Sequence, residues 1–253
     1  MQITSYGATD VGRVREQNED SYLIVEDHGL YVVADGMGGH LGGQMASSLA
    51  VKTIGEAIEE CNEEIEEGVG VDPLESSPVP RLLAMAVRKA CGAIYRTAQE
   101  DPELSGMGTT CTALLVRGER AFVAHVGDSR CYLQRGDKII QITDDHSLVN
   151  EQIKEGLITR EQARTSRLKN IITRSVGFER DVAVDTLALP VKAGDRLLMC
   201  SDGLANFVDD TEIGLALATL PLEEVPPRMV ALANERGGDD NITVVCLAAQ
   251  PDQ

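Results

Sequence analysis

The sequence predicts an α+β fold in which two antiparallel β-sheets pack together and helices cover them. Three features predict it: short apolar, β-branched runs bounded by turn residues, tight turns between neighbouring runs, and two long helical patterns between the first and the later strands. The runs expected to form strands are 22–25, 30–35, 111–116, 121–127, 131–135, 138–143, 182–189, 196–202 and 242–249.

Turn length and helical periodicity justify the individual elements. The turns at 117–120 and 135–137 are short, and because parallel strands need long crossovers, these turns indicate antiparallel hairpins. Apolar residues recur at helical spacing over about 43–60 and 80–99, and a loop that contains three prolines separates these two helices. Shorter helices are expected at 148–155, 160–163, 210–220 and 227–235.

Composition limits the classes of partner. The chain has 253 residues, which fits one large domain or two small ones, and a formal net charge of −18. Such an acidic surface repels nucleic acid phosphates and anionic membranes, so neither is expected as a partner. The sequence has no apolar run long enough to span a membrane, and its first residues are not expected to be a signal peptide. Its six cysteines form no CxxC pair, which favours a reduced, cytoplasmic protein without a zinc cluster.

Aspartates stand at the ends of several predicted strands. "VVADG" and "MCSDG" each place an Asp-Gly after an apolar run, at Asp35 and Asp202, and Asp20, Asp128 and Asp240 have similar settings. A single such aspartate is most simply a turn former or a helix cap. Five of them are harder to explain in that way, because converging carboxylates repel one another unless a cation lies among them. Oxygen ligands suit Mg²⁺ or Mn²⁺.

The glycine-rich stretch after Asp35, "GMGGHLGG", admits two interpretations. It could cradle a phosphate, but no GK[ST] follows it and GxGxxG is absent. Metal binding is the better interpretation, with the carbonyl of Gly36 as one more oxygen ligand, while the other glycines leave room for a substrate and for the next helix.

In their order along the chain, these blocks resemble the metal-dependent protein serine/threonine phosphatases of type 2C, in their compact bacterial form. The blocks are "NED", "VVADGMGGH", "GTT", "HVGDSR", "DHS", "LLMCSDGL" and "DDNITVV", and they span nearly the whole chain. The resemblance implies a four-layer αββα sandwich, a single catalytic domain over about 1–250, and a variable flap at about 147–172 beside the active site.

The resemblance also implies the metal ligands. Asp35 would bridge two ions, Asp202 and Asp240 would complete the first site, and Asp20 and the Gly36 carbonyl would complete the second. These ions would lower the pKa of a water that bridges them, and the resulting hydroxide would attack phosphorus with no phosphoenzyme intermediate.

Four further residues receive roles from the same resemblance. Glu19 would act through water in the metal shell, and Asp128 with Asp202 would hold a third, weaker ion. Arg15 would clamp the substrate phosphate with its forked guanidinium. His40 is the candidate acid for the leaving group, against a structural or substrate-contact role, since Met37 occupies the position where many eukaryotic relatives have histidine.

The expected function is therefore the dephosphorylation of serine and threonine in proteins, in the cytoplasm, opposite a cognate Ser/Thr kinase system and as a monomer. Two alternatives remain open. One is a phosphatase of small phosphorylated metabolites with the same metal chemistry, and the other is a weakly catalytic or inactive pseudophosphatase that binds phosphoproteins.

Overall fold

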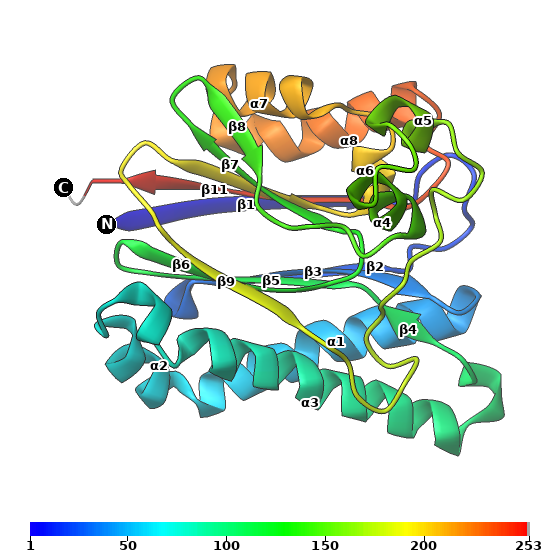
Figure 1. Ribbon diagram of the computed structural model, residues 1–253, viewed down its shortest axis with the longest axis horizontal. Coiled ribbons are helices and arrows are strands. Elements are labelled where there is room, and N and C mark those ends of the chain that lie inside the picture. The colour runs from blue at the N-terminus through cyan, green and yellow to red at the C-terminus, as the bar shows by residue number, and fades with distance from the viewer. Residues whose placement is uncertain (252–253) are drawn as a thin grey trace.

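The computed structural model describes residues 1–251, except for the side chains of His40 and Glu75, and it has four layers (Figure 1). Two β-sheets lie face to face, and helices cover the outer face of each. The predicted αββα architecture is confirmed. Within this part of the chain, no helix combines the length and apolar character needed to cross a membrane.

The first sheet has the order β1-β11-β10-β7-β8, and all its pairs are antiparallel. Helices α7 and α8 cover its outer face (Figure 1). The bounds of the strands are β1 (Gln2–Asp10), β7 (Arg130–Arg135), β8 (Lys138–Gln141), β10 (Arg196–Cys200) and β11 (Ile242–Gln250). The bounds of the helices are α6 (Asp202–Ala205), α7 (Asp210–Thr219) and α8 (Val225–Glu235).

The second sheet has the order β2-β3-β5-β6-β9, and the short strand β4 also pairs with β3. Helices α1 and α3 cover its outer face (Figure 1). The strands are β2 (Asp20–Val25), β3 (Leu30–Met37), β4 (Gly108–Thr109), β5 (Cys111–Arg117), β6 (Arg120–Val126) and β9 (Asp185–Pro190). The helices are α1 (His40–Glu60), α2 (Asn62–Val69) and α3 (Val79–Glu100), and the two helices of the predicted flap are α4 (Leu148–Lys154) and α5 (Arg160–Arg164).

Local chemistry explains where several elements begin and turn. Gly118 and Gly136 adopt positive φ angles in the β5–β6 and β7–β8 turns, which glycine does without strain. Helices α5 and α7 each begin with a complete capping box, at Thr159 and Asp209. These interactions fix the ends of the hairpins and helices.

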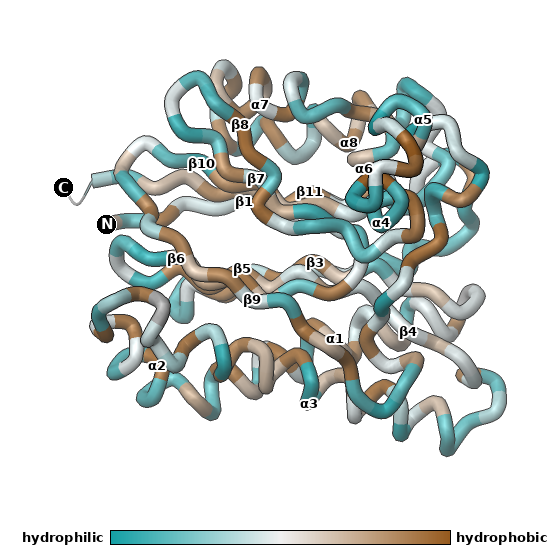
Figure 2. Tube along the Cα trace, in the orientation of Figure 1, coloured by the Kyte–Doolittle hydropathy of each residue, from teal (hydrophilic) through white to brown (hydrophobic). Residues whose placement is uncertain are grey.

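Three apolar layers hold the sandwich together. One lies between the sheets and includes Tyr31, Leu114 and Met199. The other two lie between each sheet and its helices, where the strands and the inner helix faces are apolar (Figure 2). Each fully buried Leu, Val or Ile contributes about 1.5–3 kcal/mol to folding. The three layers therefore hold the two sheets against each other and against their helices.

Several predicted boundaries are wrong. Strand β1 was not expected, and it pairs with β11 along its whole length. Strand β3 continues to Met37 because β4 pairs with Gly36 and Met37, so Asp35 lies inside a strand rather than at its end. Strand β10 ends at Cys200, and Asp202 begins helix α6.

Candidate active site

Five aspartates from both sheets converge at one end of the sandwich. Asp20 and Asp35 face each other in register on β2 and β3. Asp128 lies in the turn from β6 to β7, which connects the two sheets. Asp202 follows β10, and Asp240 comes two residues before β11. The structure therefore brings together carboxylates that are far apart in the sequence.

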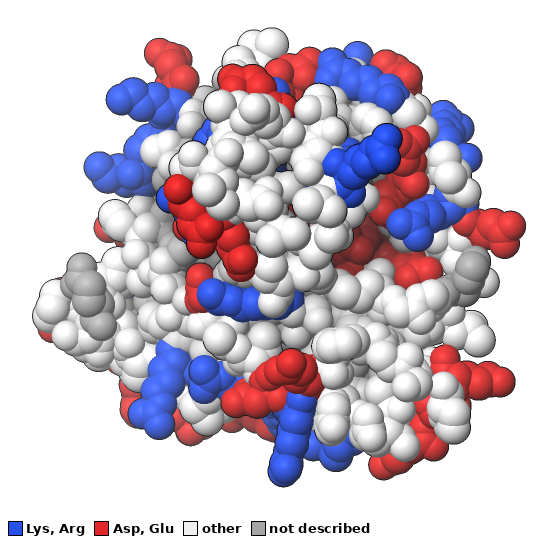
Figure 3. Space-filling model, turned by 45° about the vertical axis from the view of Figure 1, so that its right-hand side comes forward, with Lys and Arg blue, Asp and Glu red and all other residues white. Residues whose placement is uncertain are grey.

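The cluster opens into a cavity of about 300 Å³. Figure 3 shows acidic side chains recessed in a hollow on the right of the molecule, with basic side chains on its rim. Asp20 lies behind the cavity wall and is only 7% exposed. The predicted site residues that line the cavity are Arg15, Glu19, Asp35, Gly36, Asp128, Asp202 and Asp240.

Hydrogen bonds from neighbouring residues hold the aspartates in place. The Ser201 hydroxyl donates to Asp20 Oδ2 at 2.8 Å, which ties β2 to the residue before Asp202. The Asp35 N–H donates to Thr110 Oγ1 at 2.9 Å, and Thr110 Oγ1 lies 2.7 Å from Ser129 Oγ, next to Asp128. The first bond joins the two sheets, and the other two tie β3 to the loop that carries Asp128.

Glu19 and its loop pack against two glycines. A Cβ on Gly36 would lie 2.1 Å from the Gly43 carbonyl oxygen and 2.6 Å from that of Glu19. A Cβ on Gly43 would lie 1.9 Å from Glu19 Oε2. Glycine is required at both positions because backbone and carboxylate approach so closely. Asn241 holds the same loop, accepting from the Glu19 N–H at 2.8 Å.

Burial and mutual repulsion raise the pKa values of the carboxyl groups. The pKa of Asp20 rises to about 7 and that of Asp202 to about 6, in each case mainly through burial and further through neighbouring carboxylates. Burial also raises the pKa of Asp35 well above its ordinary value, followed by the charges of Asp20, Asp202, Asp128 and Asp240. The cluster is therefore strained electrostatically unless a cation joins it.

Two carboxylate oxygens at the cluster are buried without a hydrogen-bond partner, Asp20 Oδ1 and Asp202 Oδ1. Unsatisfied buried oxygens cost about 1–3 kcal/mol or more when charged, and a hard divalent cation would satisfy them. Among the side chains that the structure describes, no three of His, Cys, Asp or Glu form a ready-made metal cage. Water would then supply the remaining ligands, which is usual for Mg²⁺. The oxygen-only donors fit such an ion.

Arg15 reaches the cluster from its rim. Its Nη2 donates to Asp240 Oδ2 at 2.7 Å, and the two side chains are 49% and 25% exposed. A forked guanidinium at the mouth of the cavity has donors left for an anion. The predicted acid, His40, begins helix α1, but its side chain lies outside the described residues.

Two histidines support the loop that carries Asp128. The Gly127 N–H donates to His146 Nδ1 at 3.0 Å, so the ring proton belongs on Nε2, which lies 3.2 Å from Asp185 Oδ2. The His125 ring packs against that of His146, with centroids 4.9 Å apart. Burial lowers the pKa of both rings, that of His125 to about 4. Both rings are therefore neutral at pH 7 and have a structural role.

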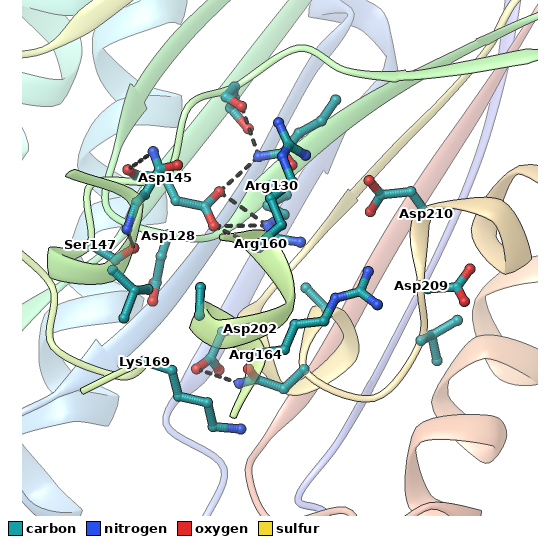
Figure 4. Close-up of a pocket in the computed structure, with 18 of the residues that line it drawn as sticks. Asp128, Arg130, Asp145, Ser147, Arg160, Arg164, Lys169, Asp202, Asp209 and Asp210 are labelled. Carbon is teal, nitrogen blue, oxygen red and sulfur yellow. Dashed lines mark hydrogen bonds and ion pairs between the residues drawn. The ribbon is translucent and has the colours of Figure 1, made fainter. Parts of the chain in front are cut away.

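A second, larger cavity of about 630 Å³ adjoins the first. Asp128 and Asp202 line both cavities, and α4, α5 and α6 surround the second one (Figure 4). The two ends of the predicted flap are held side by side by a β-bridge between Ser147 and Ile172.

Sequence reasoning missed the residues that position the site. Ser201, Asn241 and Thr110 received no role, nor did the Arg130–Asp145 ion pair, whose N–O distance is 2.7 Å. Ser201, Asn241 and Arg130 lie in blocks that contain a predicted ligand, whereas Asp145 belongs to "DHS" and Thr110 to "GTT". Membership of one of the quoted blocks was therefore the available signal, whereas the bonded partner depends on the fold.

Comparisons with known proteins agree with this architecture. The chain is 37% identical over 243 residues to the serine/threonine phosphatase stp of Listeria innocua, which covers 94% of this chain and 93% of that protein. Stp1 of Staphylococcus aureus, a serine/threonine phosphatase of solved structure, has a TM-score of 0.88 at 32% identity, covering 99% of this chain and 96% of that one.

A further solved structure is the catalytic domain of the serine/threonine protein phosphatase PstP in complex with two manganese ions. Its TM-score is 0.84 at 35% identity, covering 98% of this chain and 99% of that one. The family description "Protein phosphatase 2C" matches residues 12–238. The family and the enzyme class, a phosphatase, are those that the motifs indicated. The chain belongs to the protein phosphatase 2C family.

Proposed function

We propose that this enzyme hydrolyses phosphoserine and phosphothreonine esters in proteins with the help of two Mg²⁺ or Mn²⁺ ions. The observation that carries the proposal is the pair of buried, unpartnered oxygens on Asp20 and Asp202 beside a cavity lined by further carboxylates. Family membership and a relative solved with two manganese ions support the same chemistry.

The aspartates take the roles of ligands. Asp35 would contribute to both sites, Asp202 and Asp240 would hold one ion, and Asp20 with the Gly36 carbonyl would hold the other. When bound, the ions would lower the pKa of a water towards neutrality and offset charge on the phosphoryl oxygens. Glu19 supports the site through water.

Other groups bind and orient the substrate. Arg15 offers two N–H donors to the phosphate at the cavity mouth. Asp128, with Asp202, would hold a weaker third ion, and His40 is the proposed acid for the leaving oxygen. The described residues that line the two cavities include no cysteine, which argues against a cysteine nucleophile, and the attacking group proposed here is water. No phosphoenzyme is then formed.

We further propose a cytoplasmic monomer that opposes a Ser/Thr kinase system. The six cysteines are free, and five of them are buried, which suits a reducing compartment. Residues 1–250 would act as one catalytic domain.

Hydrolysis of a phosphothreonine peptide and of an aryl phosphate, with Mn²⁺, with Mg²⁺ and with EDTA, tests the proposal. Asp35→Asn should remove metal-dependent turnover, and Asp137→Asn, in the exposed β7–β8 turn, is the matched control. Turnover of the aryl ester alone would favour a phosphatase of small metabolites. Peptide binding without turnover would favour a pseudophosphatase. Full peptide turnover in EDTA would refute the metal chemistry.

A further inference from the structure

The larger cavity lies where a substrate's neighbouring residues would extend. Its volume of about 630 Å³ falls in the range of ligand-binding sites. Because Asp128 and Asp202 line both cavities, a chain whose phosphorylated residue occupies the smaller cavity has the larger one directly beside it.

The acidic residues of the larger cavity are already satisfied by the protein. Asp145 pairs with Arg130, and Asp209 caps helix α7 by accepting from the Glu212 N–H at 3.0 Å. The exceptions are Asp128 and Asp202, which belong to the proposed metal site; Asp202 Oδ2 accepts from the Asn206 amide at 3.1 Å, but its Oδ1 is buried without a partner. The other satisfied acids are Asp144, which lies 3.0 Å from Lys154, Glu212, which lies 2.6 Å from Arg236, and Asp210, which accepts from the Tyr132 hydroxyl at 3.1 Å.

Three basic residues of the flap line the cavity; the two on α5 form no salt bridge among the described residues, and the charge of the third, Lys169, acts on Asp202. Arg160, Arg164 and Lys169 have no side-chain hydrogen bond or ion pair among the described residues, although the protein carries a net charge of −18. Arg160 and Arg164 stand four residues apart on α5, which places them on one face of the helix. In Figure 4 both side chains extend from α5 over the cavity, with Lys169 near Asp202.

We propose that this cavity is an anion subsite that binds a carboxylate or a second phosphoryl group on a residue near the one being dephosphorylated. The inference rests on the proposed function, whose substrate it narrows to phosphoproteins with anionic residues beside the target. Arg160 and Arg164 supply the charge-assisted donors, and a guanidinium suits both kinds of anion.

The test compares phosphothreonine peptides that share one neutral sequence. One arm carries three glutamates before the phosphothreonine, a second carries them after it, and a third carries a non-hydrolysable phosphonate residue in their place. The readout is the ratio of kcat/KM for each anionic peptide to that for the neutral peptide, with Mn²⁺ present. The glutamate and phosphonate arms distinguish the two sources of negative charge.

The wild type should prefer at least one anionic peptide by about threefold to tenfold, since each exposed ion pair contributes about 0.2–1 kcal/mol. The preference should decrease at high salt. In the double variant Arg160→Gln/Arg164→Gln the ratio should fall to about one. Arg167→Gln is the matched control, because Arg167 is an exposed flap arginine that does not line the cavity, and it should keep the wild-type ratio. Lys169 stays unchanged because its charge acts on Asp202.

Equal kcat/KM for all peptides in the wild type would overturn the anion subsite and leave the proposed function intact. The subsite would also be overturned if the double variant keeps the preference, or if Arg167→Gln loses it equally. Failure of the wild type to hydrolyse even the neutral peptide would instead count against the proposed function.

Discussion

Replacing Asp20 by asparagine should stabilise the metal-free protein at neutral pH, although it damages the metal site. Burial, together with the charges of Asp202 and Asp240, raises the pKa of Asp20 from 3.8 to about 7 in the folded state. In the unfolded chain the carboxyl group ionises near its ordinary pKa. The folded state therefore binds more protons between pH 4 and 7, and the free energy of unfolding decreases as pH rises through that window.

The size of the pKa shift of Asp20 sets how much its ionisation lowers the free energy of unfolding. One pKa unit corresponds to 1.36 kcal/mol, so ionising Asp20 costs the folded protein about 4 kcal/mol at pH 7 and above. Asp20 and its neighbours titrate together, so their costs do not add. Asparagine removes the charge, and its side-chain oxygen can still accept from Ser201, but it buries an amide. We therefore expect Asp20→Asn to raise the free energy of unfolding by about 2 kcal/mol at pH 7, which corresponds to about 4–8 °C in Tm for a chain of this size.

Thermal unfolding in EDTA at pH 5 and pH 8 measures the effect. Asp20→Asn should have a higher Tm than the wild type at pH 8, and the difference should be much smaller at pH 5. Asp137→Asn should have the Tm of the wild type at both pH values. With Mn²⁺ at about 100 times its Kd the wild type should gain about 2.7 kcal/mol, and Asp20→Asn should gain less. A metal-free wild type whose stability is unchanged or increases from pH 5 to 8, with Asp20→Asn no more stable, would refute the reasoning.

Three further substitutions test the support of the site. His146→Leu should lower the free energy of unfolding by about 1–3 kcal/mol in urea, because the Gly127 N–H loses its acceptor; an unchanged midpoint would contradict this. Asp145→Ala should lower the free energy of unfolding by about 3 kcal/mol in the same assay, since it leaves Arg130 as an unpaired, mostly buried charge. The double variant Asp145→Ala/Arg130→Met should recover part of that loss, because it removes the unpaired charge. Gly36→Ala should abolish manganese binding measured by calorimetry, because its Cβ would meet backbone oxygen at 2.1 Å; retained affinity would exclude that position from the site.

Local sequence patterns predicted most elements because hairpin turns and helical periodicity are local signals. Helix α3 was expected at about 80–99 and spans Val79–Glu100. Strand β1 was missed because its sequence is polar, and its stability comes from pairing with β11, about 240 residues away. Asp35 was placed at a strand end because nothing in "VVADGM" indicates that β4 pairs with the residues after it.

The candidate ligands were predictable as a set, and their arrangement was not. The position of five aspartates at the ends of predicted strands, two of them in Asp-Gly pairs, pointed to the set, and the family resemblance assigned their roles. The structure adds that Asp20 is buried and is held by Ser201, and that Arg15 donates to Asp240. Such contacts join segments that no local pattern relates, since they depend on how the two sheets are stacked.

That stacking is itself a condition for the proposed catalysis. Asp20 and Asp35 belong to one sheet, whereas Asp202 and Asp240 flank strands of the other, so ions bound among them would connect the two sheets at one end. The apolar layer between the sheets includes Val33 and so comes within two residues of Asp35. Because protein interiors are close-packed and transmit small shifts, we expect changes in this layer to alter the spacing of the carboxylates. Mutations in the core between the sheets should therefore weaken metal affinity before they unfold the protein, whereas mutations in the outer helical layers should reduce stability with less effect on the site.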